Sequence, residues 1–319
     1  TVKSSTNNGN VTGAGYSVGG VCAINNGTSS VIDGCSNKST IVGSSYNVGG
    51  ICGHNNKGTV KNTANNTGAI KGTYNVGGVC GKNEGGKITG GSSAANILIE
   101  ATSTNSYVGG ICGYNTGKMI ASSYTGSSSN VKGVNYVGGV IGYNGSDSVK
   151  NFNARSSSTV TATGNYVGGI CGYNGGKLVG SNSYAVVSST GSYVGGIVGT
   201  NAGTVDNRAV QYSNVTGLQY VGGIAGYNTG KIQYADVHPE GYSDPLPIIK
   251  ATTAEKAYVG GACGKNTGTI RYAYPSAVVS GTMVVGGVVG ENSGKVSQSY
   301  PSSYYEGYSV TATTSSDTA

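Results

Sequence analysis

Apolar residues and glycines recur along this chain in one fixed order. Residues 107–118 read Tyr-Val-Gly-Gly-Ile-Cys-Gly-Tyr-Asn-Thr-Gly-Lys, and close variants follow one another at intervals of 26 to 38 residues. The Val-Gly-Gly element begins at ten positions: Val18, Val48, Val76, Val108, Val137, Val167, Val194, Val221, Val259 and Val285. A repeat of this length predicts an array in which each unit buries its apolar side against its neighbours.

The residue types within each copy favour strands over helices. Val, Ile, Tyr and Thr dominate the apolar positions, and Gly-Gly pairs would destabilise a helix interior. A propeller blade would need about 40 residues and regular hairpin turns. We therefore predict an all-β fold, a single β-solenoid (parallel β-helix) of about ten coils of roughly 30 residues. We expect three short strands per coil: the Tyr-Val-Gly-Gly-Ile-Cys-Gly segment, the Lys-Ile segment, and a third with the pattern Val-x-Gly. At about 4.8 Å per coil the rod would be roughly 50 Å long.

The pattern runs through the chain without a break in composition, so we expect residues 1–319 to form one continuous solenoid. The ten repeats cover about 16–300, a partial repeat precedes them at 1–15, and a Ser- and Thr-rich segment trails at 301–319. One insertion, at about 236–257, separates the eighth and ninth copies and holds three of the five prolines. The chain opens without an initiator Met or a leader, so we expect a processed or excised piece.

Six of the seven cysteines share one slot, four residues after the leading Val. They are Cys22, Cys52, Cys80, Cys112, Cys171 and Cys263, and other copies place Ile141, Val198, Ala225 or Val289 there. Such a slot requires a small apolar group, which predicts free thiols buried as small hydrophobes. Disulfides between adjacent copies are the alternative, and Cys35, outside the slot, leaves the count odd.

An Asn lies seven residues after the leading Val in every copy. The ten are Asn25, Asn55, Asn83, Asn115, Asn144, Asn174, Asn201, Asn228, Asn266 and Asn292. Stacked coils would place these amides about 4.8 Å apart, so we predict a ladder of amide hydrogen bonds. The alternative is ten copies of a polar binding site. The Gly-Gly pair either forms a corner or lies in a strand that is covered on both faces.

The residue types at the position just before the Asn predict that its side chains lie on the solvent-exposed surface. This position holds Tyr114, Tyr143, Tyr173 and Tyr227 in four copies, and His54, Lys82, Lys265 or Glu291 in others. A position that accepts Lys and Glu faces water, and regularly spaced tyrosines there are candidate contacts for a protein or glycan ligand. His238, in the insertion, is a further candidate because long loops on rigid scaffolds often carry function. An ordinary amphipathic strand surface is the alternative.

The charge of the chain and its content of reactive side chains exclude several classes of function. Charged residues are 10% of the chain, the net charge is +7, and no basic block with interleaved aromatics occurs, so we predict no nucleic-acid partner. The sequence contains no run of about 18 apolar residues, so we predict no transmembrane segment. The chain has two His and no CxxC pair, so we predict no metal site and no cofactor. We predict no catalytic residues, although Asp236, His238 and Glu240 cluster in the insertion.

The segment Gly-Gly-Ile-Cys-Gly-Tyr-Asn-Thr-Gly-Lys at 109–118, together with its nine relatives, resembles the GLUG repeat. That motif occurs in bacterial surface adhesins and in the non-catalytic part of immunoglobulin A1-specific metallopeptidases. The resemblance covers about 16–300 and implies an extracellular, β-rich stalk or adhesive region. It carries no catalytic residue to this chain, and the His-Glu-x-x-His zinc signature of those peptidases is absent from the sequence.

We therefore predict a non-enzymatic structural or adhesive segment that forms a stiff β-rod, on a bacterial surface or in a secreted protein. One alternative is a self-assembling extracellular filament, with copies joined end-to-end through open solenoid ends. Another is a β-helical carbohydrate-active enzyme that would use Asp236, His238 or Glu240.

Overall fold

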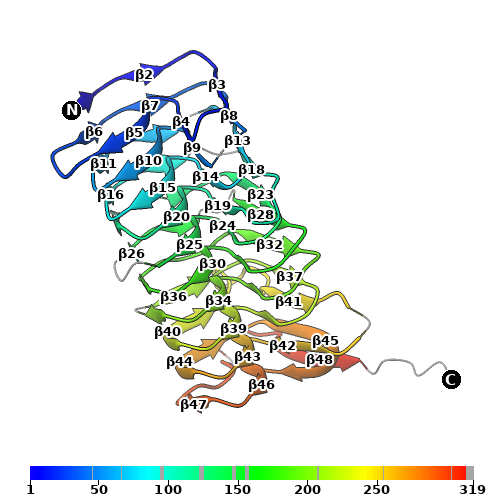
Figure 1. Ribbon diagram of the computed structural model, residues 1–319. Helices are drawn as coiled ribbons and strands as arrows, with labels where there is room; N and C mark the ends of the chain where they lie inside the picture. Colours follow the sequence, from blue (N-terminus) through cyan, green and yellow to red (C-terminus); the bar gives the residue numbers. More distant parts are fainter. Residues whose placement is uncertain are drawn as a thin grey trace.

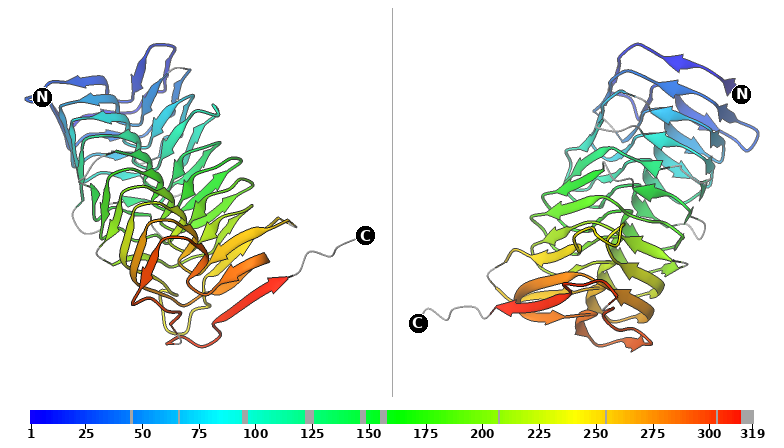
Figure 2. Two further views of the ribbon diagram at one scale, coloured as in Figure 1. Left: turned by 60° about the horizontal axis from the view of Figure 1, so that its bottom comes forward. Right: turned by 180° about the vertical axis from the view of Figure 1, so that it is seen from behind.

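The computed structural model describes residues 1–313, apart from 45, 66, 94–96, 122–125, 146–148, 155–157, 207, 254 and 303. The described residues contain strands and loops and no helix. Parallel strands stack one coil on the next into the predicted β-solenoid, and the chain runs from one end of the stack to the other (Figures 1 and 2). No helix that could cross a membrane is found among these residues.

Strands that occupy the same place in successive coils form five columns, numbered here in chain order. Column 1 contains β1 (Val2–Lys3), β6 (Val31–Asp33), β11 (Thr59–Lys61), β16 (Lys87–Thr89), β21 (Lys118–Ile120), β26 (Val149–Lys150), β31 (Lys177–Val179), β35 (Thr204–Asp206), β40 (Lys231–Val237), β44 (Thr269–Pro275) and β47 (Lys295–Ser297). Column 2 contains β2 (Thr6–Asn7), β7 (Ser36–Asn37), β12 (Ala64–Asn65), β17 (Ser92–Ser93), β22 (Gly126–Ser127), β27 (Asn153–Ala154) and, joined through a bridge at Ser183, β36 (Ala209–Gln211).

The next two columns belong to one large sheet. Column 3 contains β3 (Val11–Gly13), β8 (Ile41–Gly43), β13 (Ile70–Gly72), β18 (Leu98–Ala101), β23 (Asn130–Gly133), β28 (Thr159–Ala162), β32 (Val186–Ser189), β37 (Val215–Gly217), β41 (Ile248–Ala251), β45 (Val278–Gly286) and β48 (Ser309–Thr313). Column 4 contains β4 (Ser17–Gly19), β9 (Asn47–Gly49), β14 (Asn75–Gly77), β19 (Tyr107–Gly109), β24 (Val137–Gly138), β29 (Val167–Gly168), β33 (Val194–Gly195), β38 (Val221–Gly222) and β42 (Ala257–Gly260), and β45 extends into it.

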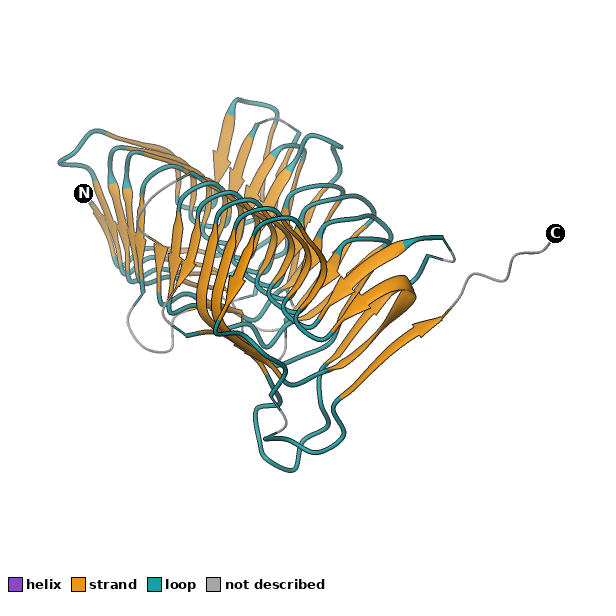
Figure 3. Cartoon of the chain, turned by 90° about the horizontal axis from the view of Figure 1, so that it is seen from below, coloured by secondary structure: helices purple, strands orange, loops and turns teal. Residues whose placement is uncertain are grey.

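Column 5 closes each coil. It contains β5 (Cys22–Asn26), β10 (Cys52–Asn56), β15 (Cys80–Glu84), β20 (Cys112–Asn115), β25 (Ile141–Asn144), β30 (Cys171–Asn174), β34 (Val198–Asn201), β39 (Ala225–Asn228), β43 (Cys263–Asn266) and β46 (Val289–Asn292). The columns surround a narrow core when the molecule is viewed along the stack (Figure 3).

The coil from residue 31 to 56 has five short strands where the sequence predicts three. The predicted first strand is divided in two, β9 and β10, because the chain bends at Gly50 and Ile51. Val48, Ile51 and Cys52 are all fully buried. A straight strand alternates its side chains between two faces and would expose one of these three. The Gly-Gly pair is therefore a corner, and no second covered face is needed.

The corner requires glycine because backbones approach closely there. A Cβ on the first Gly of each pair would overlap the carbonyl oxygen three residues further on, as between Gly138 and Ile141. A Cβ on the second Gly would overlap the same glycine's carbonyl in the next coil, as between Gly139 and Gly169. Any side chain would push successive coils apart, so both positions are glycine in all ten copies.

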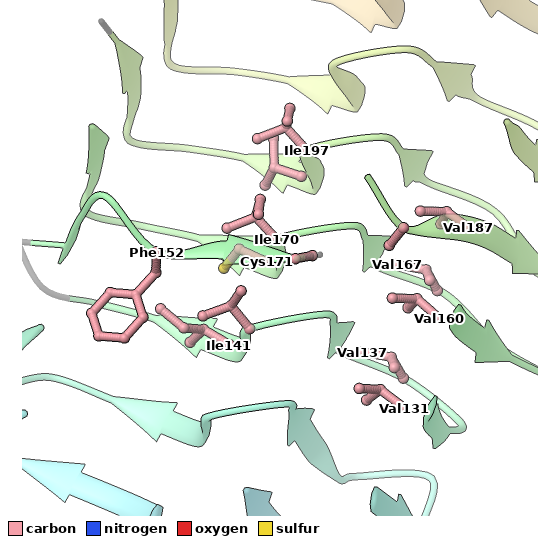
Figure 4. Close-up of a cluster of buried hydrophobic side chains, with 14 of the residues drawn as sticks. Val131, Val137, Ile141, Phe152, Val160, Val167, Ile170, Cys171, Val187 and Ile197 are labelled. Carbon is pink, nitrogen blue, oxygen red and sulfur yellow. The ribbon is translucent and has the colours of Figure 1, made fainter. Parts of the chain in front are cut away.

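The core consists of files of like side chains, one from each coil. Figure 4 shows part of it, with Val131, Val160 and Val187 from column 3 near Val137 and Val167 from column 4. Phe152, the one Phe of the chain, is fully buried in the same cluster. In several coils the third segment ends in Gly, where the leading Val of the same coil needs room: a Cβ on Gly133 would lie 2.8 Å from Val137 Cγ2.

The cysteines lie inside, as predicted. Cys52, Cys80, Cys112, Cys171 and Cys263 are fully buried, Cys35 is buried outside the slot, and Cys22 is half-buried in the first complete coil. Each is a free thiol, and disulfides are absent from the described residues. The thiols of the slot turn toward their own strand: Cys80 Sγ donates to Lys82 O at 3.0 Å, and Cys263 Sγ to Lys265 O at 3.0 Å.

The predicted asparagine ladder is present and continuous. In every step the side-chain Nδ2 of one coil donates to Oδ1 of the next, from Asn25 to Asn292, over distances of 2.7–3.0 Å. The eight ladder asparagines from Asn55 to Asn266 are fully buried. All the amides point the same way, so the ladder has a direction.

A second corner follows column 1 and uses left-handed backbone. Its residues have positive φ in most coils and are Ser4, Gly34, Asn62, Gly90, Asn151, Gly180, Arg208, Tyr234, Tyr272 and Gln298. Gly and Asn tolerate this conformation well, whereas Arg, Tyr and Gln tolerate it poorly. The ladder asparagines themselves lie in strands with ordinary φ, so the left-handed turn that Asn tolerates occurs after column 1.

Part of the predicted insertion at 236–257 belongs to the regular stack. Asp236 and Val237 finish β40, β41 pairs in register with β37 of column 3, and Ala257 of β42 pairs with Met283 of β45. The loop proper is 238–247. Of the trailing segment, β48 continues column 3 by pairing with β45, and residues 314–319 lie outside the described part of the chain.

Candidate functional site: tyrosine rows and the His238 corner

Two rows of tyrosines run along the outside of columns 4 and 5. The first row lies at the start of column 4, and its ring centroids are 4.7–5.3 Å apart from Tyr107 through Tyr136, Tyr166, Tyr193 and Tyr220 to Tyr258. The rings stack from Tyr136 onward, whereas Tyr107 is tilted by 41° against Tyr136. In a shorter run in the early coils, Tyr46 stacks on Tyr74 and is tilted against Tyr16, both at 4.9 Å. The spacing of the rings equals the spacing of the coils, because each ring lies on its counterpart in the next coil.

The second row contains the tyrosines that the sequence nominates as contact residues. Tyr114, Tyr143 and Tyr173 are half-buried and stack at 4.8 and 5.5 Å with nearly parallel rings. They meet the first row edge-on, as between Tyr107 and Tyr114 at 5.4 Å. Tyr227 is separated from them by Thr200, which is buried, and it lies 6.0 Å from Tyr193. Three of the four nominated tyrosines therefore form one aromatic surface.

Ion pairs replace the tyrosines of the second row toward both ends of the stack. His54 Nε2 lies 3.0 Å, and Lys82 Nζ 2.9 Å, from Glu84 Oε2. Desolvation, together with the Lys82 charge, lowers the pKa of His54, and the hydrogen bond from Lys82 lowers the pKa of Glu84. At the other end Lys265 Nζ lies 3.4 Å from Glu291 Oε1 and within 6.0 Å of the Tyr220 and Tyr258 ring centroids.

The stacking determines what the tyrosine rows can bind. Where neighbouring rings of a row are stacked, each covers a face of the next, so these faces are occupied and the ring edges remain available. A sugar ring that stacks on an aromatic face has no free face inside the row. The rows thus offer phenol edges and hydroxyl groups at coil spacing, which suits an extended partner with regularly spaced polar groups.

His238 lies elsewhere, on the corner that follows column 2. Its ring meets Tyr212 edge-on, with the ring centroids 5.1 Å apart. It stacks on Tyr305 with a centroid distance of 5.5 Å and an interplanar angle of 10°. His238 Nδ1 lies 2.7 Å from Pro239 O and 3.4 Å from the Tyr305 hydroxyl. Tyr184 stacks under Tyr212 at 4.4 Å. The structure thus separates His238 from the nominated tyrosines and gives it aromatic partners of its own.

Sequence reasoning missed Tyr184, Tyr212 and Tyr305 as neighbours of His238. The spacing of 28 residues between Tyr184 and Tyr212 equals the repeat length, and the parallel bridge between Ser183 and Gln211 aligns them in adjacent coils. That signal was available in the sequence. Tyr305 gave no such signal, because it reaches His238 from a loop 67 residues further along the chain.

The acids of the insertion do not all lie at one site: Glu240 and Asp244 line one cavity, which Asp236 does not. Asp236 is half-buried on β40, where its Oδ1 accepts from Tyr274 N at 3.2 Å, and burial raises the pKa of its carboxyl. Glu240 and Asp244 are exposed on the loop beyond His238. Among the described residues, no group of three or more His, Cys, Asp or Glu is arranged to hold a metal ion.

Comparisons with protein-family models, with curated proteins and with solved structures found no match to this chain.

Proposed function

We propose that this chain is a non-enzymatic, extracellular structural or adhesive segment that acts as a stiff rod. The observation that carries the proposal is the uninterrupted asparagine ladder from Asn25 to Asn292, which ties every complete coil to the next through buried amides. Satisfied polar chains of this kind rigidify a stack and fix its register. The resemblance to the GLUG repeat and the low charge support an extracellular or bacterial-surface location.

The tyrosine rows supply the adhesive face in this proposal. They form a half-buried aromatic strip along one side of the rod, and a host protein or glycan would meet the phenol edges of several coils at once. Contacts repeated along the rod add through avidity, so each can be weak.

The rod is tested by negative-stain electron microscopy and small-angle X-ray scattering on the purified chain. We expect separate, straight particles roughly 50 Å long, as coils at about 4.8 Å predict. A flexible or collapsed particle would contradict the rod. Cleavage of any member of a polysaccharide panel, abolished by Asp236→Asn or Glu240→Gln, would overturn the non-enzymatic assignment in favour of a β-helical carbohydrate-active enzyme.

A filament subunit is the second candidate, and one observation favours it. Apolar core residues are only half-buried in the first coils, at Val11, Val21 and Cys22, and in the last, at Val285, Val288, Val289 and Val296. Stacked end-to-end, two copies would cover these residues and extend the parallel columns. The same micrographs decide: particles in multiples of the single rod length support the filament, and single rods at all concentrations exclude it.

A further inference from the structure

A cavity of about 190 Å³ opens beside the 238–247 loop. Two half-buried tyrosines, two prolines and two carboxylates line it: Tyr184, Tyr212, Pro239, Pro245, Glu240 and Asp244. It interrupts the repeat, because the ten-residue loop at 238–247 lies beside Tyr184 and Tyr212 of the preceding coils.

The aromatic wall of the cavity is held firmly. Tyr184 and Tyr212 stack at 4.4 Å with an interplanar angle of 14°. Their backbones belong to the stack: Tyr212 N donates to Ser183 O at 2.9 Å, and Ser213 Oγ donates to Tyr184 O at 2.8 Å. The edge of the His238 ring closes one side of Tyr212. Burial raises the pKa of Tyr212 to about 12, with a contribution from the Glu240 charge.

A second loop supports the first from outside. Tyr305 stacks on His238, and Tyr242 lies 5.9 Å from the rings of both Tyr304 and Tyr305. These contacts join residues of the 238–247 loop to the 298–308 segment, and Figure 2 shows the two segments close together near the C-terminal end of the stack. The cavity is thus formed before any ligand arrives, which reduces the entropy lost on binding.

The charge of the cavity is opposite to that of the chain. The chain carries a net charge of +7, yet the cavity is lined by Glu240 and Asp244 and by no Lys or Arg. Asp244 Oδ2 already accepts from Gly241 N at 2.8 Å. Carboxylates beside aromatic rings attract a cation that also has apolar surface.

The hydrogen bonding favours an ammonium over a guanidinium group. A guanidinium fork binds best to both oxygens of one carboxylate, and because Gly241 N engages one oxygen of Asp244, such a fork could use Glu240 alone and would leave Asp244 without a share of the charge. An ammonium is a compact charge with three donors that can point at separate carboxylates while its alkyl chain lies on tyrosine and proline. We propose that this cavity binds a primary alkylammonium group, the chemistry shared by free alkyl amines and by a lysine side chain of a partner protein.

Protein-observed NMR at pH 7 tests the proposal with n-butylammonium chloride, with the neutral isostere n-butanol, and with the peptide acetyl-Gly-Lys-Gly-amide. We expect n-butylammonium to shift resonances of Tyr184, Tyr212 and the 238–247 loop in a saturable way, and n-butanol to bind at least fivefold more weakly. Tighter binding of the peptide identifies a protein lysine as the source, and tighter binding of the free amine identifies a small-molecule ligand.

Matched charge variants complete the test. Glu240→Gln is expected to weaken n-butylammonium binding at least fivefold, whereas Glu255→Gln, which removes an exposed acid outside the cavity, leaves it within twofold. Both substitutions are on the surface, and circular dichroism verifies the fold. Equal binding of n-butanol, or unchanged affinity in Glu240→Gln, would overturn the proposal. The proposed rod does not depend on this result, because its evidence is the shape of the particle.

Discussion

At the scale of single residues, each interior ladder asparagine links its own coil to both neighbouring coils. Asn201 accepts from Asn174 and donates to Asn228, both at 2.8 Å, and its Nδ2 also lies 3.1 Å from Lys231 O. It is fully buried. A buried amide that bridges two coils and a neighbouring turn fixes the register of all three segments.

We predict that Asn201→Ala lowers the free energy of unfolding by about 2 kcal/mol, because buried partners lose their hydrogen bonds. The control is Asn292→Ala, at the exposed end of the same ladder, for which we expect a change within about 0.5 kcal/mol. Chemical denaturation followed by circular dichroism measures both. Equal effects at the two positions would show that burial of the ladder is unimportant.

The buried thiols make stability depend on pH. Burial raises the pKa of Cys263 to about 12 and raises that of Cys171 further. In the unfolded chain a thiol titrates near pH 8.5, so at higher pH the unfolded chain has released protons that the folded chain retains. Proton release therefore favours unfolding, and the contribution of each thiol is present below about pH 8.5 and lost as the pH rises.

Cys171→Val tests this linkage, because the same slot already accepts Val198 and Val289. Between pH 7.5 and 9.5, under reducing conditions, we expect the parent chain to lose about 1.4 kcal/mol more stability than the variant, the contribution of one thiol. Urea denaturation at the two pH values measures the difference. Identical pH dependence in both proteins would mean that Cys171 titrates normally in the folded chain.

At the scale of the strand and its turn, the corner after column 1 requires a left-handed backbone conformation in most coils. Gly90 has φ +64°, and a Cβ added there would meet only ordinary contacts, the nearest at 3.6 Å. Any cost of substitution at Gly90 therefore comes from the backbone conformation and not from crowding.

We predict that Gly90→Val destabilises the chain by about 1–2 kcal/mol, the cost of a left-handed residue with a side chain. Gly175→Val is the matched control: its φ is not positive, and its added Cβ would have a nearest contact of 3.5 Å. Thermal unfolding of the two variants in parallel is the measurement. Similar melting temperatures would contradict the strain argument.

The columns show how far the sequence predicts the fold. Repeated positions, such as the cysteine and asparagine slots, could be assigned to core and ladder. Comparing ten copies shows which residue types each position accepts. The bend at Gly50 could not be assigned, because an apolar run at positions 48, 51 and 52 fits both a bent strand and a strand covered twice. Burial of all three side chains resolves it.

The candidate sites were less predictable from the sequence, because they depend on side-chain directions and on contacts between loops that do not repeat. Tyr114, Tyr143 and Tyr173 repeat and could therefore be nominated from the sequence, but their mutual stacking, which hides the ring faces, depends on side-chain direction. The His238 corner arises where two non-repeating loops meet, at His238 and Tyr305. Nothing in the local sequence of either loop indicates the other, because tertiary proximity alone brings them together.

At the scale of the whole molecule, a regular scaffold carries a local feature that does not repeat, the cavity beside the 238–247 loop. Columns 1, 3, 4 and 5 continue in register from coil to coil among the described residues, whereas the cavity near Glu240 occurs at one height on the stack. A ligand for the tyrosine rows would meet many equivalent positions. A ligand for the cavity would bind at one position, near the C-terminal end, and would therefore distinguish the two ends of the rod.

The stacking of coils also determines how the molecule responds to tension. Each coil is held only by its neighbours, so a load applied to the two ends of the chain peels coils from an end one after another. Every released coil adds about 30 residues of slack, or roughly 100 Å of extended chain. We predict that single-molecule pulling gives steps of that contour length, and a single all-or-none extension would refute it. The repeat that sets the spacing of the coils also sets the length by which the rod yields under load.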